Sequence, residues 1–127
     1  MPARPVLLRG AAKKYSPDVF NKWTDKYLEE HFGEESFDVE VGKKENRDDP
    51  LRHMKMKDYL KEYHSGDLYL VDDLKASMMK DNNLLPILKQ GGYTDNLGEA
   101  VMWFSSGGTK SGTHNDEYEG LNCLFDG

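Results

Sequence analysis

The chain has 127 residues, of which 37% are hydrophobic and 31% are charged, and its formal net charge is −6. This length fits one soluble domain with a modest core, and the acidic balance argues against a nucleic-acid partner, because phosphate binding needs a basic surface. A membrane partner is not expected either, since no apolar run reaches the roughly 20 residues of a membrane span.

Two further features bear on the compartment in which the protein works. Cys123 is the one cysteine of the chain, so an intramolecular disulfide is excluded and a reducing compartment is favoured. The opening residues, MPARPVLLRG, lack the long apolar core and the cleavage pattern of a signal peptide. We therefore expect a cytoplasmic or nuclear protein.

The first third of the sequence predicts a strand and then helices. Pro5 to Arg9 (PVLLR) is a short apolar run that ends at a glycine, which is typical of a strand. Ser16-Pro17-Asp18 predicts a helix start, because serine caps and proline fits the first helical position. Thr24 offers a second cap, which would divide the helix in two, and Gly33 is a fitting end. Apolar residues at helical spacing are expected in the core, namely Phe20, Trp23, Tyr27, Leu28 and Phe32.

The middle of the sequence predicts strands that alternate with short helices. Phe37, Val39 and Val41 alternate with acidic residues, as in a half-buried strand. Asp72 or Asp73 is expected to cap a later helix. The other expected segments are a solvated loop at 43–50, a short helix at 57–64, a strand at 68–71, the capped helix carrying Leu74, Met78 and Met79, and an irregular stretch at 82–92.

The last quarter of the sequence predicts two more strands. Apolar runs lie at 100–104 and 121–125, and a serine- and glycine-containing turn at 105–108 follows the first. Helices thus come first and strands concentrate late. This order indicates an α+β fold that leads into a mainly antiparallel sheet.

His114-Asn115-Asp116 is the motif that carries chemistry. In a strand, residues two apart point to the same face, so the imidazole of His114 and the carboxylate of Asp116 would project together. Such a pair offers two adjacent ligands for a divalent metal, and one more histidine would complete the facial arrangement that leaves positions open on iron. Considered alone, this pattern also occurs by chance, and a surface turn that contains a histidine would be the better explanation.

The surroundings of this motif carry a family resemblance. An apolar strand with Trp103-Phe104, a Gly107-Gly108-Thr109 turn and Ser111 precede it, and Tyr118-Glu119 follows it. The segments PVLLRG, WTDKYL, MKDYL and LYL fit in order upstream. This ordered set resembles the JmjC/cupin-like Fe(II)- and 2-oxoglutarate-dependent oxygenases. The resemblance is closest to the small hydroxylase branch, which includes the lysyl hydroxylase JmjC protein and the asparaginyl hydroxylase of hypoxia-inducible factor.

The resemblance implies a fold and a division of the chain. It implies N-terminal helices followed by the first part of a double-stranded β-helix, the jelly-roll or cupin fold. Residues 1–98 would be the helical and strand support, and residues 99–127 the metal-binding strands. The chain would correspond to the N-terminal portion of such a domain, ending after the strand with the His-x-Asp motif, with the third iron-binding histidine and the basic cosubstrate anchor coming later.

The resemblance also implies roles for individual residues. His114 and Asp116 would bind Fe(II), while Ser111 and Tyr69 match hydroxyl residues that lie near the distal carboxylate of 2-oxoglutarate. The family commonly has an asparagine four residues after the aspartate, where this chain has Gly120, and Asn122 is a partial substitute two residues further on. The implied activity is hydroxylation of a protein side chain.

Other interpretations stay open at this stage. The chain could be a non-catalytic, truncated interaction module, or a cupin-type metal-binding protein without oxygenase activity. Ser111 is equally explained as an ordinary turn hydroxyl, and Tyr69 is better explained as a structural tyrosine of a strand. Cys123 is expected to be a buried and inert thiol. The remaining histidines, His31, His53 and His64, are expected to be solvated or capping residues. The sequence does not indicate an oligomeric state.

Overall fold

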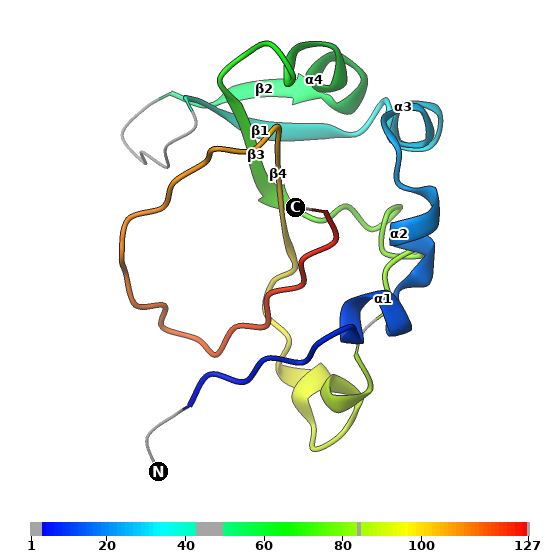
Figure 1. Ribbon diagram of the computed structural model, residues 1–127, viewed down its shortest axis with the longest axis vertical. Helices are drawn as coiled ribbons and strands as arrows, with labels where there is room; N and C mark the ends of the chain where they lie inside the picture. The colour runs from blue at the N-terminus through cyan, green and yellow to red at the C-terminus, as the bar shows by residue number, and fades with distance from the viewer. Residues whose placement is uncertain (1–3, 43–49, 84, 127) are drawn as a thin grey trace.

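The centre of the molecule is a four-stranded antiparallel sheet with helices along one side (Figure 1). The computed structural model describes residues 4–42, 50–83 and 85–126. The strands are β1 (Ser36–Val41), β2 (Arg52–Lys55), β3 (Leu68–Asp73) and β4 (Val101–Ser105), in the order β2-β1-β3-β4. The helices are α1 (Ala11–Tyr15), α2 (Pro17–Lys22), α3 (Asp25–Phe32) and α4 (Met56–Glu62), with short 3-10 turns η1 (Pro86–Lys89) and η2 (Tyr93–Asn96). The expected α+β class, with an antiparallel sheet, is therefore present.

No helix in the described part of the chain is long and apolar enough to cross a membrane.

Helices α2 and α3 lie where the sequence predicts them, whereas α1 was not predicted. Pro17 occupies the first position of α2 after Ser16, and Thr24 starts α3 by accepting a hydrogen bond from the Tyr27 amide at 3.2 Å. Gly33 follows the end of α3. The prediction of two helical pieces is confirmed. Thr24 caps α3 locally as expected, but Ser16 makes no side-chain cap for α2, because its hydroxyl bonds to Asn82 and Asn83 instead.

The core lies between one sheet face and the helices α3 and α4. The register places Phe37 opposite Met54, and Leu70 opposite both Val39 on β1 and Phe104 on β4. Phe37, Val39 and Leu70 have no exposed surface. The apolar residues of the alternating pattern that predicted β1 thus form its buried face. The helix side of the core consists of Leu28, Phe32, Met56, Tyr59 and Leu60.

Strand β2 is a feature that the sequence did not predict. Its four residues, RHMK, contain a single apolar side chain, Met54, which faces the core opposite Phe37. A short edge strand with one inward side chain carries too little periodicity to be recognised. Of the loop expected at 43–50, residues 43–49 lie outside the described residues, and Pro50 is irregular.

The strand expected at Pro5 to Arg9 is not formed. Residues 4–8 have no regular structure, and Val6 and Leu7 are 77% and 72% exposed. An apolar run becomes a strand only where a neighbouring strand accepts its backbone hydrogen bonds. None of the four described strands pairs with this run.

The prediction of a helix capped by Asp72 or Asp73 is also wrong. Both residues belong to β3, where they pair with Met102 and Val101 of β4, so their backbone is not free to begin a helix. The carboxylate of Asp72 instead accepts a hydrogen bond from the Asp38 amide at 2.9 Å. Residues 76–81 form turns in place of a helix.

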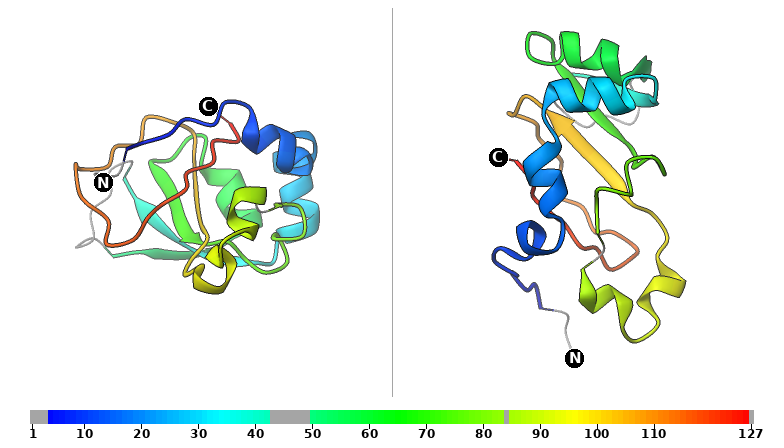
Figure 2. Two further views of the ribbon diagram at one scale, coloured as in Figure 1. Left: turned by 90° about the horizontal axis from the view of Figure 1, so that it is seen from below. Right: turned by 90° about the vertical axis from the view of Figure 1, so that its right-hand side faces the viewer.

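The last strand expected, at 121–125, is absent as well. After β4 the chain runs as a wide arc of irregular backbone and returns to the N-terminal helices (Figures 1 and 2). There Phe125 packs edge-on against Phe20 of α2, with ring centroids 5.4 Å apart. Within the run at 121–125, Phe125 therefore packs against another aromatic ring, but the run pairs with none of the described strands.

A buried carboxylate fastens the turn after β3 to the N-terminal helices. Asp81 is 5% exposed, and its Oδ2 accepts hydrogen bonds from Trp23 Nε1 at 3.1 Å and from the Tyr27 hydroxyl at 2.9 Å. The hydrogen bond to this carboxylate raises the pKa of Tyr27. Nearby, the Ser16 hydroxyl lies 2.9 Å from both the Asn82 Oδ1 and the Asn83 carbonyl oxygen.

We expect Asp81→Ala to lower the free energy of unfolding by about 2 to 3 kcal/mol, because two partly buried donors lose their acceptor. Chemical denaturation measures this change. Asp95→Ala, at an exposed residue of η2, is the matched control and should change stability by less than about 0.5 kcal/mol. Equal effects of the two substitutions would contradict the role given to Asp81.

A second polar contact joins α4 to α3. The Tyr63 hydroxyl lies 3.0 and 3.1 Å from the two carboxylate oxygens of Asp25, to which it donates. Burial, followed by this hydrogen bond, raises the pKa of Tyr63 to about 12. The folded protein therefore holds the phenol proton more tightly than the unfolded chain, where tyrosine titrates near pH 10.

Stability should consequently fall as the pH rises from about 10 to about 12, because the unfolded chain releases this proton first. The Tyr63 contribution is fully present below about pH 10. The free energy of unfolding, measured by urea denaturation across this range, should fall more steeply with pH for the wild-type protein than for Tyr63→Phe. The difference in slope should be up to about 1 kcal/mol per pH unit. Tyr118→Phe, at a side chain that is 85% exposed, should keep the wild-type slope.

Candidate functional site

His114 and Asp116 lie in the irregular segment that follows β4. Residues 111–116 have no strand structure, so the expectation that the two share one face of a strand is wrong. The backbone instead bends so that His114 Nε2 lies 3.3 Å from Asp116 Oδ1.

A backbone contact orients the imidazole of His114. Its Nδ1 lies 2.7 Å from the carbonyl oxygen of Gly112. A carbonyl oxygen can only accept, so Nδ1 must carry the hydrogen of this bond. The neutral ring therefore presents the lone pair of Nε2 toward Asp116.

This arrangement brings two electron-rich atoms together. The Nε2 lone pair and the Asp116 carboxylate repel one another unless a proton or a cation lies between them. Two ligand atoms about 2.1 Å from one ion, at right angles to each other, are about 3.0 Å apart, which is close to the observed 3.3 Å. The pair is chemically suited to hold either a proton or a divalent metal ion.

The pair supplies two ligands and is open to solvent. The side chains of His114 and Asp116 are 49% and 73% exposed. Across residues 4–42, 50–83 and 85–126, no three His, Cys, Asp or Glu side chains gather closely enough to hold a metal ion. Water would have to fill the other coordination positions of an ion bound at these two residues.

The other predicted site residues are not gathered around this pair. Ser111 and Asn122 are exposed, and in the described part of the chain neither forms a side-chain hydrogen bond with His114 or Asp116. Tyr69 is 7% exposed in β3, opposite Glu40 of β1 and Ser105 of β4. Its neighbour Ser105 is the last residue of the strand from which the site segment departs.

A buried tyrosine holds the base of the site segment. The Tyr59 hydroxyl of α4 donates a hydrogen bond to the carbonyl oxygen of Phe104 on β4. The Phe104 ring also packs against Tyr59 and Tyr63, with centroids 5.4 and 4.9 Å away. Burial raises the pKa of Tyr59, which keeps its hydroxyl protonated as a donor. The point at which the segment leaves the sheet is thereby fixed.

Two other histidines also lie beside aspartates, which the sequence analysis did not foresee. His53 Nδ1 is 3.0 Å from Asp38 Oδ1 across β1 and β2, and His64 Nε2 is 3.2 Å from Asp25 Oδ2. The β1–β2 register places Asp38 opposite His53, but this signal needs the unpredicted strand β2. Within the described residues, the second ring nitrogen of each makes no hydrogen bond, unlike that of His114.

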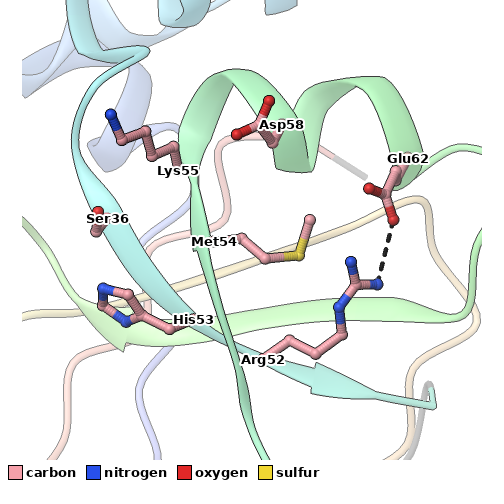
Figure 3. Close-up of a pocket in the computed structure, with 7 residues that line it drawn as sticks. All are labelled: Ser36, Arg52, His53, Met54, Lys55, Asp58 and Glu62. Carbon is pink, nitrogen blue, oxygen red and sulfur yellow. Dashed lines mark hydrogen bonds and ion pairs between the residues drawn. The ribbon is translucent and has the colours of Figure 1, made fainter.

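Strand β2 and helix α4 border an open depression (Figure 3). It is lined by Ser36, Arg52, His53, Met54, Lys55, Asp58 and Glu62. Arg52 Nη1 donates to Glu62 at 3.1 Å, and Lys55 Nζ lies 2.6 Å from Glu34. These cations are already neutralised, so the depression is a weaker candidate for a site than the His114 pair.

Cys123 is half-buried, and burial raises the pKa of its thiol. A raised pKa leaves little thiolate, which is the reactive form. The half-buried position therefore gives no indication of a catalytic cysteine.

Comparison with protein families gives one match over the whole chain. A family model described as a cupin-like domain matches residues 1–127. Comparison with curated proteins and with solved structures gives no match.

Proposed function

Because the chain belongs to the family of cupin-like domains, we propose that it acts as an Fe(II)- and 2-oxoglutarate-dependent oxygenase domain. The family includes 2-oxoglutarate oxygenases and also other metal-binding proteins. In this proposal His114 and Asp116 hold the iron, and the substrate is a protein side chain that is hydroxylated. The third iron ligand is not among the described residues.

The observation that carries the proposal is the orientation of the His114 ring. Metal-binding histidines commonly donate their second ring N–H to a carbonyl or carboxylate, which fixes the tautomer and aims the other nitrogen at the metal. The Gly112 carbonyl provides this acceptor at 2.7 Å, and Nε2 faces Asp116. Neither His53 nor His64, the other histidines beside an aspartate, shows this second contact within the described residues.

The remaining roles follow from the chemistry of the side chains. When bound, Fe(II) would supply the redox chemistry that couples oxidation of 2-oxoglutarate to hydroxylation of a C–H bond. The hydroxyls of Ser111 and Tyr69, and the amide of Asn122, are donors that can bind the distal carboxylate of 2-oxoglutarate without adding charge. The His114 ring must be neutral at Nε2 to bind the metal, so protons compete with it.

A second candidate is a cupin-type metal-binding or interaction module without oxygenase activity. The solvent exposure of both ligands favours it, because an exposed site protects a reactive oxidant poorly. The two candidates share metal binding at His114. They differ in whether 2-oxoglutarate joins the metal.

We expect Mn(II), used as a redox-stable substitute for Fe(II), to bind near His114. In NMR spectra its paramagnetism should broaden the resonances of residues 112–118 before all others. His114→Ala should remove this selective broadening, because the variant lacks the Nε2 ligand.

The matched control is His53→Ala, since His53 also lies beside an aspartate. This variant should leave the broadening at 112–118 unchanged. Broadening that starts at His53 or at His64, or that survives in His114→Ala, would refute the metal assignment.

The oxygenase interpretation makes a further prediction. 2-Oxoglutarate should tighten Mn(II) binding severalfold, because its keto-acid end can chelate the same ion, whereas succinate, which lacks the keto group, should not. Ser111→Ala should reduce the enhancement and leave binding of Mn(II) alone unchanged. If 2-oxoglutarate and succinate act alike while Mn(II) still binds at His114, the module without oxygenase activity is supported instead.

A further inference from the structure

Charge is distributed unequally between the start of the chain and the rest. The first 17 residues hold four of the 17 Lys and Arg residues and none of the 23 Asp and Glu residues. Residues 18–127 therefore carry 13 basic and 23 acidic side chains, a net charge of −10. We call residues 4–14, which carry all four early cations, the basic segment.

The basic segment is exposed and its charges are not neutralised within the chain. Arg4, Arg9, Lys13 and Lys14 are all exposed. In the described structure none of them forms an ion pair with a carboxylate, and Lys14 contacts only the ring of Tyr15, at 5.2 Å. Exposed apolar side chains lie among these cations: Val6 at 77%, Leu7 at 72% and Leu8 at 46%.

Residues 116–126, which we call the acidic segment, have the opposite character. This segment contains Asp116, Glu117, Glu119 and Asp126 and no Lys or Arg. Glu117, Glu119 and Asp126 are exposed, and none forms an ion pair among the described residues. Exposed apolar side chains accompany them as well: Tyr118 at 85%, Leu121 at 47% and Leu124 at 70%.

The geometry points to a second copy of this chain as the partner, and we propose that the basic segment of one protomer binds the acidic segment of another. The two segments match in length, in opposite charge and in exposed apolar side chains. Both also contain a run with a strand pattern, at 5–9 and 121–125, that pairs with none of the described strands. A two-fold dimer would form this contact twice, which doubles the buried apolar surface.

The charge balance favours a second copy over an anionic membrane. The basic segment with its apolar residues could approach anionic lipid, but the remainder of the same molecule carries −10 and would be repelled. A second copy presents that acidic remainder as an attractive surface. The basic segment lies at the end of the molecule away from β2 and α4 (Figure 1), and its four cations are exposed.

Sedimentation equilibrium of the wild-type chain tests the proposal first. The protein should dimerise, and the association constant should fall by about tenfold or more between about 0.05 and about 0.5 M NaCl, as the screening length shrinks from roughly 14 to roughly 4 Å. A monomer at every protein concentration in low salt would overturn the proposal.

Charge reversal gives the sharper test. Arg9→Glu with Lys13→Glu, and separately Glu117→Lys with Glu119→Lys, should each weaken self-association by about tenfold or more, because like charges then face each other. An equimolar mixture of the two variants should associate again, since each supplies the charge that the other has lost. None of these four residues is a proposed metal ligand, so metal binding at His114 is an independent measurement.

Controls separate this contact from general charge effects. Lys26→Glu with Lys89→Glu makes the same change in net charge at exposed residues outside both segments, and should leave the association constant within about twofold. Failure of the mixed variants to associate would overturn the proposal. So would a monomeric protein that binds phosphatidylserine vesicles through Arg9 and Lys13, which would identify a lipid surface as the partner.

Discussion

Strand β3 is the element on which the rest of the structure depends, because it links β4 to β1, the other strand that is hydrogen-bonded along both edges. It pairs with β1 on one side and with β4 on the other. Leu70, at its centre, is fully buried and lies opposite Val39 and Phe104 at once. The two pairings and the packing of α3 and α4 reinforce each other, since the buried face of the sheet exists only when all three strands are in register.

This arrangement also decides where the candidate site begins. β4 is an edge strand, and Tyr59 fastens its end through the carbonyl oxygen of Phe104. Residues 111–126 have no strand structure, so His114 is oriented by contacts within its own segment: the Gly112 carbonyl and the Asp116 carboxylate. The pair therefore depends little on the core, whereas Tyr69 is buried within β3.

The features that could be predicted are those whose causes are local in sequence. Thr24 and Gly33 delimit α3 because the atoms that cap a helix lie within a few residues of its ends. Alternation predicted β1 and the apolar run predicted β4. The wrong predictions concern strand pairing, which depends on distant segments. The runs at 5–9 and 121–125 have strand character but pair with none of the described strands. Asp73 was expected to cap a helix, but its backbone pairs with β4. β2 was missed because its own residues carry little strand pattern, and the strand forms mainly through its pairing with β1.

The sequence by itself determined where α2 and α3 lie, the approximate positions of β1, β3 and β4, membership of the cupin-like family and the closeness of His114 to Asp116 along the chain. Only the tertiary structure decided that this pair lies in irregular backbone with its ring turned by Gly112, that Asp81 is buried beneath Trp23 and Tyr27, and that two oppositely charged segments stay exposed. The physical reason is the separation along the sequence over which each interaction acts. Capping and short spacing act within a few residues, while burial and strand pairing depend on which distant segments arrive beside one another.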